Sequence, residues 1–147
     1  MRLPGIVLFS ILLAASTALA GFNLKSGVYH MDELDAAESA ALSARKPIAF
    51  LYSDQKTFCP LCIGASRQVM ETLAGSCVVV YVSRSDAANL PQQVQNALRS
   101  PAAGKYIPVV VVMSYDLKKV IAIVPYAKGE AYKKLLSEAK KKVLSKK

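Results

Sequence analysis

Histidine, cysteine and tryptophan are scarce in this chain of 147 residues. It has one histidine, His30, three cysteines and no tryptophan. Because no second histidine or carboxylate stands at a useful spacing, His30 is interpreted as a surface residue or the start of a helix, not as a metal ligand or base. The sequence also lacks internal repeats, Gly/Ser-rich linkers and low-complexity tracts, apart from a Lys-rich end. These absences favour one compact folded unit.

The N-terminal residues have the pattern of a secretory signal. Arg2 supplies a positive start, residues 6–15 form an apolar core, and Ala-Leu-Ala precedes a cleavage site. We therefore expect a signal peptide at 1–20 and a single domain at 21–147, exported across the inner membrane to the periplasm. An uncleaved membrane anchor is the alternative, because residues 3–20 carry no charge. With no cysteine near the cleavage site, a lipoprotein is not expected.

The formal net charge of +9 is concentrated at the C-terminus. Residues 128–147 hold eight of the 19 basic residues and only two of the ten acids. Apolar side chains fall on one helical stripe, at Tyr132, Leu135, Leu136, Ala139 and Val143. This pattern predicts a Lys-rich amphipathic helix docked on the domain, with its lysines in solvent. Contact with an anionic membrane or an acidic partner is the alternative, and nucleic acid is not expected for an exported protein.

The most informative motif is Cys59-Pro60-Leu61-Cys62, which follows an apolar run at residues 48–52. Proline suits the first position of a helix, because its φ is already helical and its missing N–H would be unpaired there anyway. Cys59 is therefore expected at the helix start, with Cys62 one turn further along. Residues three apart share a helix face, with Cβ atoms about 5–6 Å apart, which is close to what a disulfide tolerates. The pair is expected to open and close with little backbone movement.

The cysteines are expected to differ in role. Cys59 lies at the exposed helix end, where unpaired N–H groups and the helix dipole lower a thiol pKa, so it is the expected nucleophile. Cys62 packs against the first turn and is the expected resolving thiol, which attacks a mixed disulfide on Cys59. Cys77 begins an apolar run and is interpreted as a buried, inert thiol. A regulatory or intermolecular thiol is the alternative for Cys77.

Hydrophobic periodicity and turn residues predict four helices and four strands. The predicted helices cover residues 32–44, 60–73, 89–98 and 129–144, and the predicted strands cover residues 48–52, 77–82, 109–113 and 120–124. Two strands are almost entirely β-branched, as expected for a sheet covered by helices on both faces. A short connection makes the last two strands a predicted hairpin. The predicted fold class is an α/β sandwich with a mixed sheet.

Most of the chain, from residue 31 to residue 145, resembles the thioredoxin-like superfamily. Three features coincide: the Cys59 and Cys62 pair after a core strand, the order of elements, and Ile107-Pro108 just before the third predicted strand. The resemblance implies a thioredoxin-like three-layer α/β/α sandwich in which Pro108 is cis and lies beside the cysteine pair. It also implies that Ile107 and Pro108 bind substrate, through pairing of the Ile107 backbone with an extended peptide. An ordinary trans proline opening an edge strand is the alternative.

The chain departs from the commonest thioredoxin pattern next to its cysteines. Phe58 stands where many thioredoxins have Trp, and Pro-Leu between the cysteines is closer to glutaredoxins and periplasmic disulfide oxidases. The histidine that strongly stabilises the thiolate in those oxidases is absent, so a moderate redox poise is expected. The nearest candidate for the family's buried acid is Asp54, for which a solvent-facing turn residue is the alternative. Lys56 adds positive potential near Cys59 or is an ordinary surface lysine.

The expected function is that of an extracytoplasmic thiol-disulfide oxidoreductase, with Cys59 as nucleophile and Cys62 as resolving thiol. Expected partners are cysteine-containing proteins and a membrane redox partner, and the chain is expected to be a monomer without a bound cofactor or metal. Two alternatives stay open. In one, the cysteine pair is a static staple in a redox-silent interaction domain. In the other, the two thiolates hold a soft ion such as copper.

Overall fold

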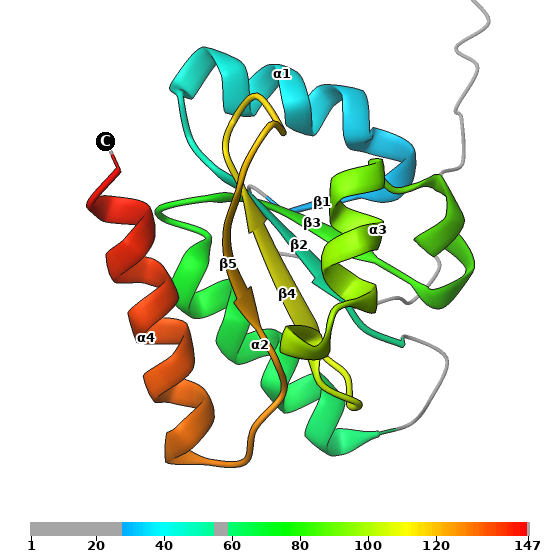
Figure 1. The fold of residues 1–147 in the computed structure, drawn as a ribbon, viewed down its shortest axis with the longest axis vertical. Helices are drawn as coiled ribbons and strands as arrows, with labels where there is room; N and C mark the ends of the chain where they lie inside the picture. Colours follow the sequence, from blue (N-terminus) through cyan, green and yellow to red (C-terminus); the bar gives the residue numbers. More distant parts are fainter. Residues whose placement is uncertain (1–27, 55–58, 147) are drawn as a thin grey trace, which may run out of the picture.

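A computed structural model describes residues 28–54 and 59–146, whose centre is a five-stranded sheet (Figure 1). The strands are β1 (Val28–His30), β2 (Ile48–Tyr52), β3 (Val78–Val82), β4 (Val109–Met113) and β5 (Val120–Val124). The helices are α1 (Leu34–Ala44), α2 (Pro60–Leu73), α3 (Gln92–Arg99) and α4 (Glu130–Leu144), with short 3₁₀ helices at Met31–Glu33, Arg84–Asn89 and Pro101–Ala103. The strand order is β1-β3-β2-β4-β5. Strand β3 is parallel to β1 and β2, whereas β4 runs antiparallel to both β2 and β5.

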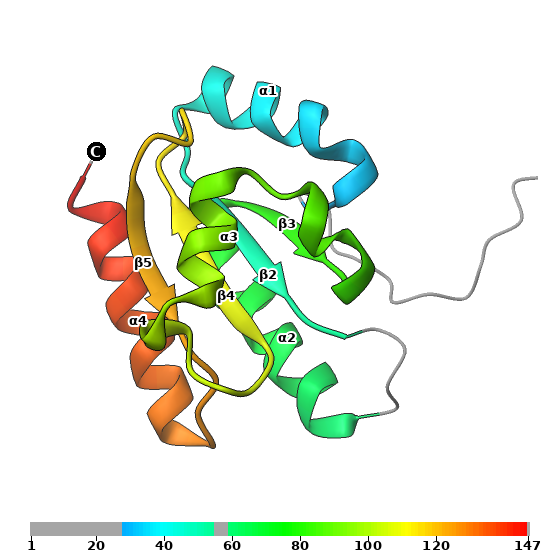
Figure 2. The ribbon, with the colours of Figure 1, turned by 45° about the vertical axis from the view of Figure 1, so that its right-hand side comes forward.

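Helices cover both faces of this mixed sheet, with α2 and α4 on one face and α1 and α3 on the other (Figure 2). Successive side chains of a strand point to opposite faces. Ala49 and Leu51 of β2 therefore pack with α2 and α4, while Ile48 and Phe50 pack with α1 and α3. Every residue of β3 and β4 is buried, which explains their uninterrupted apolar sequences. The predicted three-layer α/β/α sandwich with a mixed sheet is confirmed.

Strong local patterns gave accurate bounds for several elements. Strands β2, β4 and β5 and helix α2 begin and end at the predicted residues. The predicted hairpin is present, with β4 and β5 antiparallel and the turn closed by a hydrogen bond from the Ser114 N–H to the Lys119 carbonyl at 2.8 Å. Each of these elements combines a continuous apolar or periodic run with a clear turn signal, so its bounds are fixed locally.

The N-terminal part of the sandwich differs from the prediction. Strand β1 was not predicted, because three residues at a sheet edge are too short for a periodic pattern. The first helix also starts later than predicted, because Met31–Glu33 form a 3₁₀ turn before α1 begins at Leu34. His30 is exposed at the end of β1 and directly precedes this turn, in agreement with its interpretation as a surface residue at a helix start.

The prediction for the start of α3 was also wrong. A helix was predicted at 89–98, but α3 starts at Gln92 and Arg84–Asn89 form a 3₁₀ helix. Pro91 explains the boundary, because the residue before a proline is pushed out of the helical conformation, and Leu90 is extended, with ψ of 151°. Cys77 likewise precedes β3 instead of starting it.

The Lys-rich C-terminal segment forms α4 and packs against the sheet. Tyr132, Leu136, Ala139 and Val143 are buried, and Leu135 packs beside them. The exposed lysines of this helix include Lys133, Lys134, Lys141 and Lys142, while Lys140 is half-buried. The docked amphipathic helix is therefore confirmed. Among residues 28–54 and 59–146, no helix has the length and apolar character needed to cross a bilayer; the predicted signal at 1–20 lies outside the described residues.

Candidate functional site

The cysteine pair lies at the N-terminus of α2, in the arrangement expected from its sequence. Cys59 is the capping residue with an extended backbone (φ −101°, ψ 98°), and Pro60 occupies the first turn. The Cys62 N–H donates to the Cys59 Sγ at 3.3 Å, and the Ile63 N–H donates to the Cys59 carbonyl at 3.1 Å. Cys59 therefore uses its sulfur as the helix cap, a role usually taken by the oxygen of Ser, Thr, Asp or Asn.

The two thiols have opposite pKa shifts. The pKa of Cys59 is lowered, first by a hydrogen bond from the Cys62 side chain and then by the Cys62 N–H, because both donors stabilise the thiolate. The pKa of Cys62 is raised to about 11, first by desolvation and then by its hydrogen bond to Cys59 and the charge there. Both residues are half-buried and have free thiols. The arrangement therefore makes Cys59 the thiol of the pair that ionises first as pH rises.

Apolar side chains surround the exposed start of α2. Leu61 is 66% exposed and Ile63 is 37% exposed. Large apolar side chains in solvent beside a reactive group often mark a surface that contacts a partner. The flanking residues Phe58 and Lys56, which were singled out from the sequence, lie outside the described residues.

A small polar group lies behind the pair, at the end of β2. Ser53 and Ser66 are both buried, and the Ser66 hydroxyl donates to the Ser53 hydroxyl at 3.4 Å. Burial raises the pKa of Tyr81, while a hydrogen bond with Ser53 lowers it. Sequence reasoning missed these three residues, although Tyr81 interrupts an otherwise all-valine strand and that break was a usable signal.

Asp54, the candidate for the family's buried acid, directly follows Ser53 and is half-buried. Its charge contributes to the raised pKa of both Cys62 and Tyr81. An electrostatic effect on Cys62 requires the carboxylate to be near that thiol. Asp54 therefore combines features of both interpretations made from sequence. It is a half-buried residue just after β2, and its charge raises the pKa of Cys62.

Ile107 and Pro108 lie just before β4, and the peptide bond between them is cis, as the resemblance implied. Pro108 is buried and Ile107 is half-buried. Ile107 lines a hollow of about 220 Å³ together with Ser53 and Asp54. The fold therefore brings Ile107 next to the end of β2, which leads into the cysteine pair.

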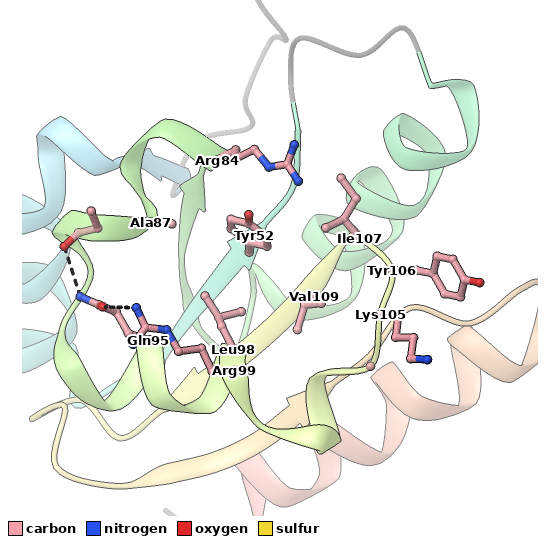
Figure 3. A pocket seen from close by; sticks show the side chains of 12 residues that line it. Tyr52, Arg84, Ala87, Gln95, Leu98, Arg99, Lys105, Tyr106, Ile107 and Val109 are labelled. Carbon is pink, nitrogen blue, oxygen red and sulfur yellow. Dashed lines mark hydrogen bonds between the residues drawn. The ribbon is translucent and has the colours of Figure 1, made fainter.

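A larger hollow of about 480 Å³ adjoins the first one, between this loop and α3 (Figure 3). Tyr52, Leu98 and Val109 line its inner part, and Arg84 and Arg99 line its edges. The two hollows share lining residues, including Tyr52, Arg84 and Ile107. Sequence reasoning missed this groove, because its residues come from β2, the Arg84–Asn89 turn, α3 and the loop before β4, which only the fold brings together.

The third cysteine, Cys77, is 2% exposed, as predicted for a buried thiol. Desolvation raises its pKa to about 12, although the nearby charge of Lys46 acts in the opposite direction. A thiol in this state is a poor nucleophile. Among the described residues, no group of three or more His, Cys, Asp or Glu side chains is placed to hold a metal ion.

No family model and no curated protein sequence matches this chain. Several solved structures are similar to it. A structure of DsbH oxidoreductase has a TM-score of 0.49 and 20% identity, with 88% of this chain and 92% of that chain covered. The disulphide isomerase from Xylella fastidiosa Temecula1 has a TM-score of 0.45 and 18% identity, with coverage of 78% and 88%. The J-Trx1 fragment of ERdj5 has a TM-score of 0.44 and 15% identity, with coverage of 80% and 52%.

Proposed function

We propose that this protein is an extracytoplasmic thiol-disulfide oxidoreductase that exchanges disulfides with cysteine-containing partner proteins. The observation that carries the proposal is the unequal thiol pair at the start of α2. Cys62 donates to the Cys59 sulfur and lowers its pKa, while its own pKa is raised to about 11. Disulfide exchange needs one thiolate that attacks the partner disulfide and a second thiol that then resolves the mixed disulfide.

The proposed reaction starts from the reduced pair. The Cys59 thiolate attacks one sulfur of a partner disulfide, forms a mixed disulfide, and releases the partner's other sulfur as a thiolate. Cys62 then loses its proton and attacks the Cys59 sulfur, which releases the partner's second thiol and leaves a Cys59–Cys62 disulfide. The partner gains two electrons and the pair loses two, and the same steps in reverse oxidise a partner.

Binding of the partner is assigned to Ile107 and Pro108. Pro108 has no N–H to donate, and the adjoining Ile107 backbone is available to pair with an extended segment of a partner, a sequence-tolerant mode of binding. The exposed Leu61 and Ile63 add an apolar surface beside the reacting sulfur. The proposal also includes export of the protein through a signal at residues 1–20. A membrane protein would return the cysteine pair to its starting redox state after each reaction.

Trapping of mixed disulfides tests this function. Cys62→Ser removes the resolving thiol, so a partner attacked by Cys59 stays covalently attached. The variant is expressed in a bacterial cell envelope in a Cys77→Ala background, which leaves Cys59 as the only thiol. Adducts that disappear on reduction are expected, and they should be absent from the matched Cys59→Ala, Cys77→Ala variant, which keeps Cys62.

Two results would contradict the proposal. No adduct from Cys62→Ser, together with a Cys59–Cys62 disulfide that resists glutathione, would make the pair a structural staple. Stoichiometric copper bound to the purified reduced protein, and lost on Cys59→Ala, would make it a metal-handling site.

A further inference from the structure

The groove of about 480 Å³ beside Ile107 has a one-sided charge. Its lining includes Arg84, Arg99 and Lys105, and no acidic residue. Within residues 28–54 and 59–146, none of these three cations forms a salt bridge. They come from three separate segments and belong to the body of the domain, so this local charge is distinct from that of the Lys-rich helix α4.

Arg84 and Arg99 both line this groove. In Figure 3 they lie on either side of the Tyr52 ring, with Leu98 and Val109 nearby. The Arg84 side chain extends on the Ile107 side, and the Arg99 side chain points toward Gln95. Arg99 donates to the Gln95 side chain at 3.4 Å, and Gln95 donates to the Leu90 carbonyl at 2.8 Å. This chain of hydrogen bonds ties Arg99 to the turn before α3.

The groove adjoins the smaller hollow at Ile107, the residue assigned to partner binding. The smaller hollow, which reaches Ser53 and Asp54, shares Tyr52, Arg84 and Ile107 with it. A peptide that lies extended along Ile107 advances about 3.3 Å per residue. An extended segment of a few residues is therefore long enough to reach from Ile107 into the groove.

We infer that this groove binds carboxylate side chains of the partner, so that the preferred substrates are extended segments with Asp or Glu near the reacting cysteine. The inference rests on the proposed exchange function and names its substrate class. Guanidinium groups bind carboxylates through two parallel hydrogen bonds, and the apolar floor accommodates the stems of those side chains. Because both arginines are exposed, the preference is expected to weaken with salt.

Three matched peptides test the substrate class. Each contains one cysteine activated as a 2-pyridyl disulfide and differs only in flanking residues, which are Glu, Gln or Lys. Attack by Cys59 releases pyridine-2-thione, and closure by Cys62 releases the peptide thiol. At low ionic strength the Glu peptide should react about 10-fold faster than the Gln peptide and the Lys peptide slowest, with the differences shrinking as salt rises.

Charge reversal tests the groove itself. Arg84→Glu with Arg99→Glu should reverse the order, so that the Lys peptide becomes the fastest. The control, Lys141→Glu with Lys142→Glu, changes the net charge by the same amount on α4, which covers the opposite face of the sheet. It should leave the wild-type order unchanged. Equal effects of the two double variants would overturn the inference.

Binding of cysteine-free versions of the peptides separates this inference from the proposed function. Fluorescence anisotropy should show tighter binding of the Glu version than of the Gln version, and the difference should be lost in the double arginine variant. Equal binding by the wild-type protein would overturn the groove inference even if all peptides react. Failure of every activated peptide to react would instead overturn the exchange function, whatever the binding order.

Discussion

The Cys62 N–H donates to the Cys59 sulfur at 3.3 Å. Cys59 is therefore the N-cap of α2, and its own pKa is lowered by the helix that it caps. The same hydrogen bond closes the helix start and stabilises a negative charge on Cys59. Cys62 also contributes its side-chain S–H, which is the largest cause of the lowered Cys59 pKa. The second cysteine therefore acts on the first before any partner is bound.

This relationship predicts different effects for two substitutions of Cys62. Cys62→Ser keeps an O–H donor near Cys59, whereas Cys62→Ala removes the side-chain donor and keeps only the backbone N–H. The Cys59 pKa should therefore be higher in Cys62→Ala than in Cys62→Ser. The rate of iodoacetamide alkylation as a function of pH, measured in a Cys77→Ala background, gives both pKa values. Equal values would show that the side-chain donor has no effect.

Cys77 should make stability depend on pH in the alkaline range. Its pKa rises from 9.0 in the unfolded chain to about 12 in the folded protein, so the unfolded state loses this proton first. The contribution of Cys77 to stability is complete below pH 9 and is lost as pH rises toward 12. The free energy of unfolding of the wild type minus that of Cys77→Ala should be constant at neutral pH and should fall above pH 9. A difference that is flat across this range would contradict the prediction.

Tyr132 offers a stabilising substitution. Its side chain is 1% exposed, and among the described residues its hydroxyl has no hydrogen-bond partner. Leaving a buried hydroxyl unpaired costs about 1–3 kcal/mol, so Tyr132→Phe should raise the free energy of unfolding by about 1 kcal/mol. Urea denaturation measures the change. Tyr126→Phe, at the half-buried ring 5.7 Å from Tyr132, should have little effect, and a loss of stability in Tyr132→Phe would reveal a bond to the hydroxyl.

Two glycines should respond oppositely to alanine. Gly64 lies within α2, where an added Cβ meets nothing within 4 Å, so Gly64→Ala should stabilise the protein by about 0.5–1 kcal/mol. Gly104 has φ of +71° and ψ of −165°, and its added Cβ would lie 3.3 Å from the Pro125 Cβ. Gly104→Ala should therefore destabilise the protein by about 1–3 kcal/mol. Thermal unfolding of both variants checks the signs, and the same sign for both would contradict the account.

How much of this molecule the sequence predicts depends on how local each signal is. The cysteine pair, its proline and the strand before it lie within 15 residues (48–62), so the start of α2 was predicted with its correct bounds. Strand β1 has no such pattern, because it is fixed by pairing with β3, about 50 residues away. The fold class was accessible because apolar strands alternate with amphipathic helices.

The groove beside Ile107 was beyond sequence reasoning for a similar reason. Nothing in the sequence distinguishes Arg84 and Arg99 from other cations. Only the fold brings the Arg84–Asn89 turn and α3 together, so that both arginines line one groove with Tyr52. Most of the net positive charge in the sequence belongs to the C-terminal lysines, several of which lie on the solvent face of α4. Sequence composition gives the total charge, but the position of a charge relative to a cavity comes from the fold.

Equilibrium with glutathione shows whether Cys59 and Cys62 form a working redox pair. The Cys77→Ala protein is equilibrated in glutathione buffers of graded ratio, quenched with acid and alkylated, and mass spectrometry gives the fraction with a Cys59–Cys62 disulfide. We expect a reversible transition with a midpoint between about −270 and −120 mV, the range of known thiol-disulfide oxidoreductases. A disulfide that never forms, or one that stays closed below about −300 mV as structural disulfides do, would contradict this expectation.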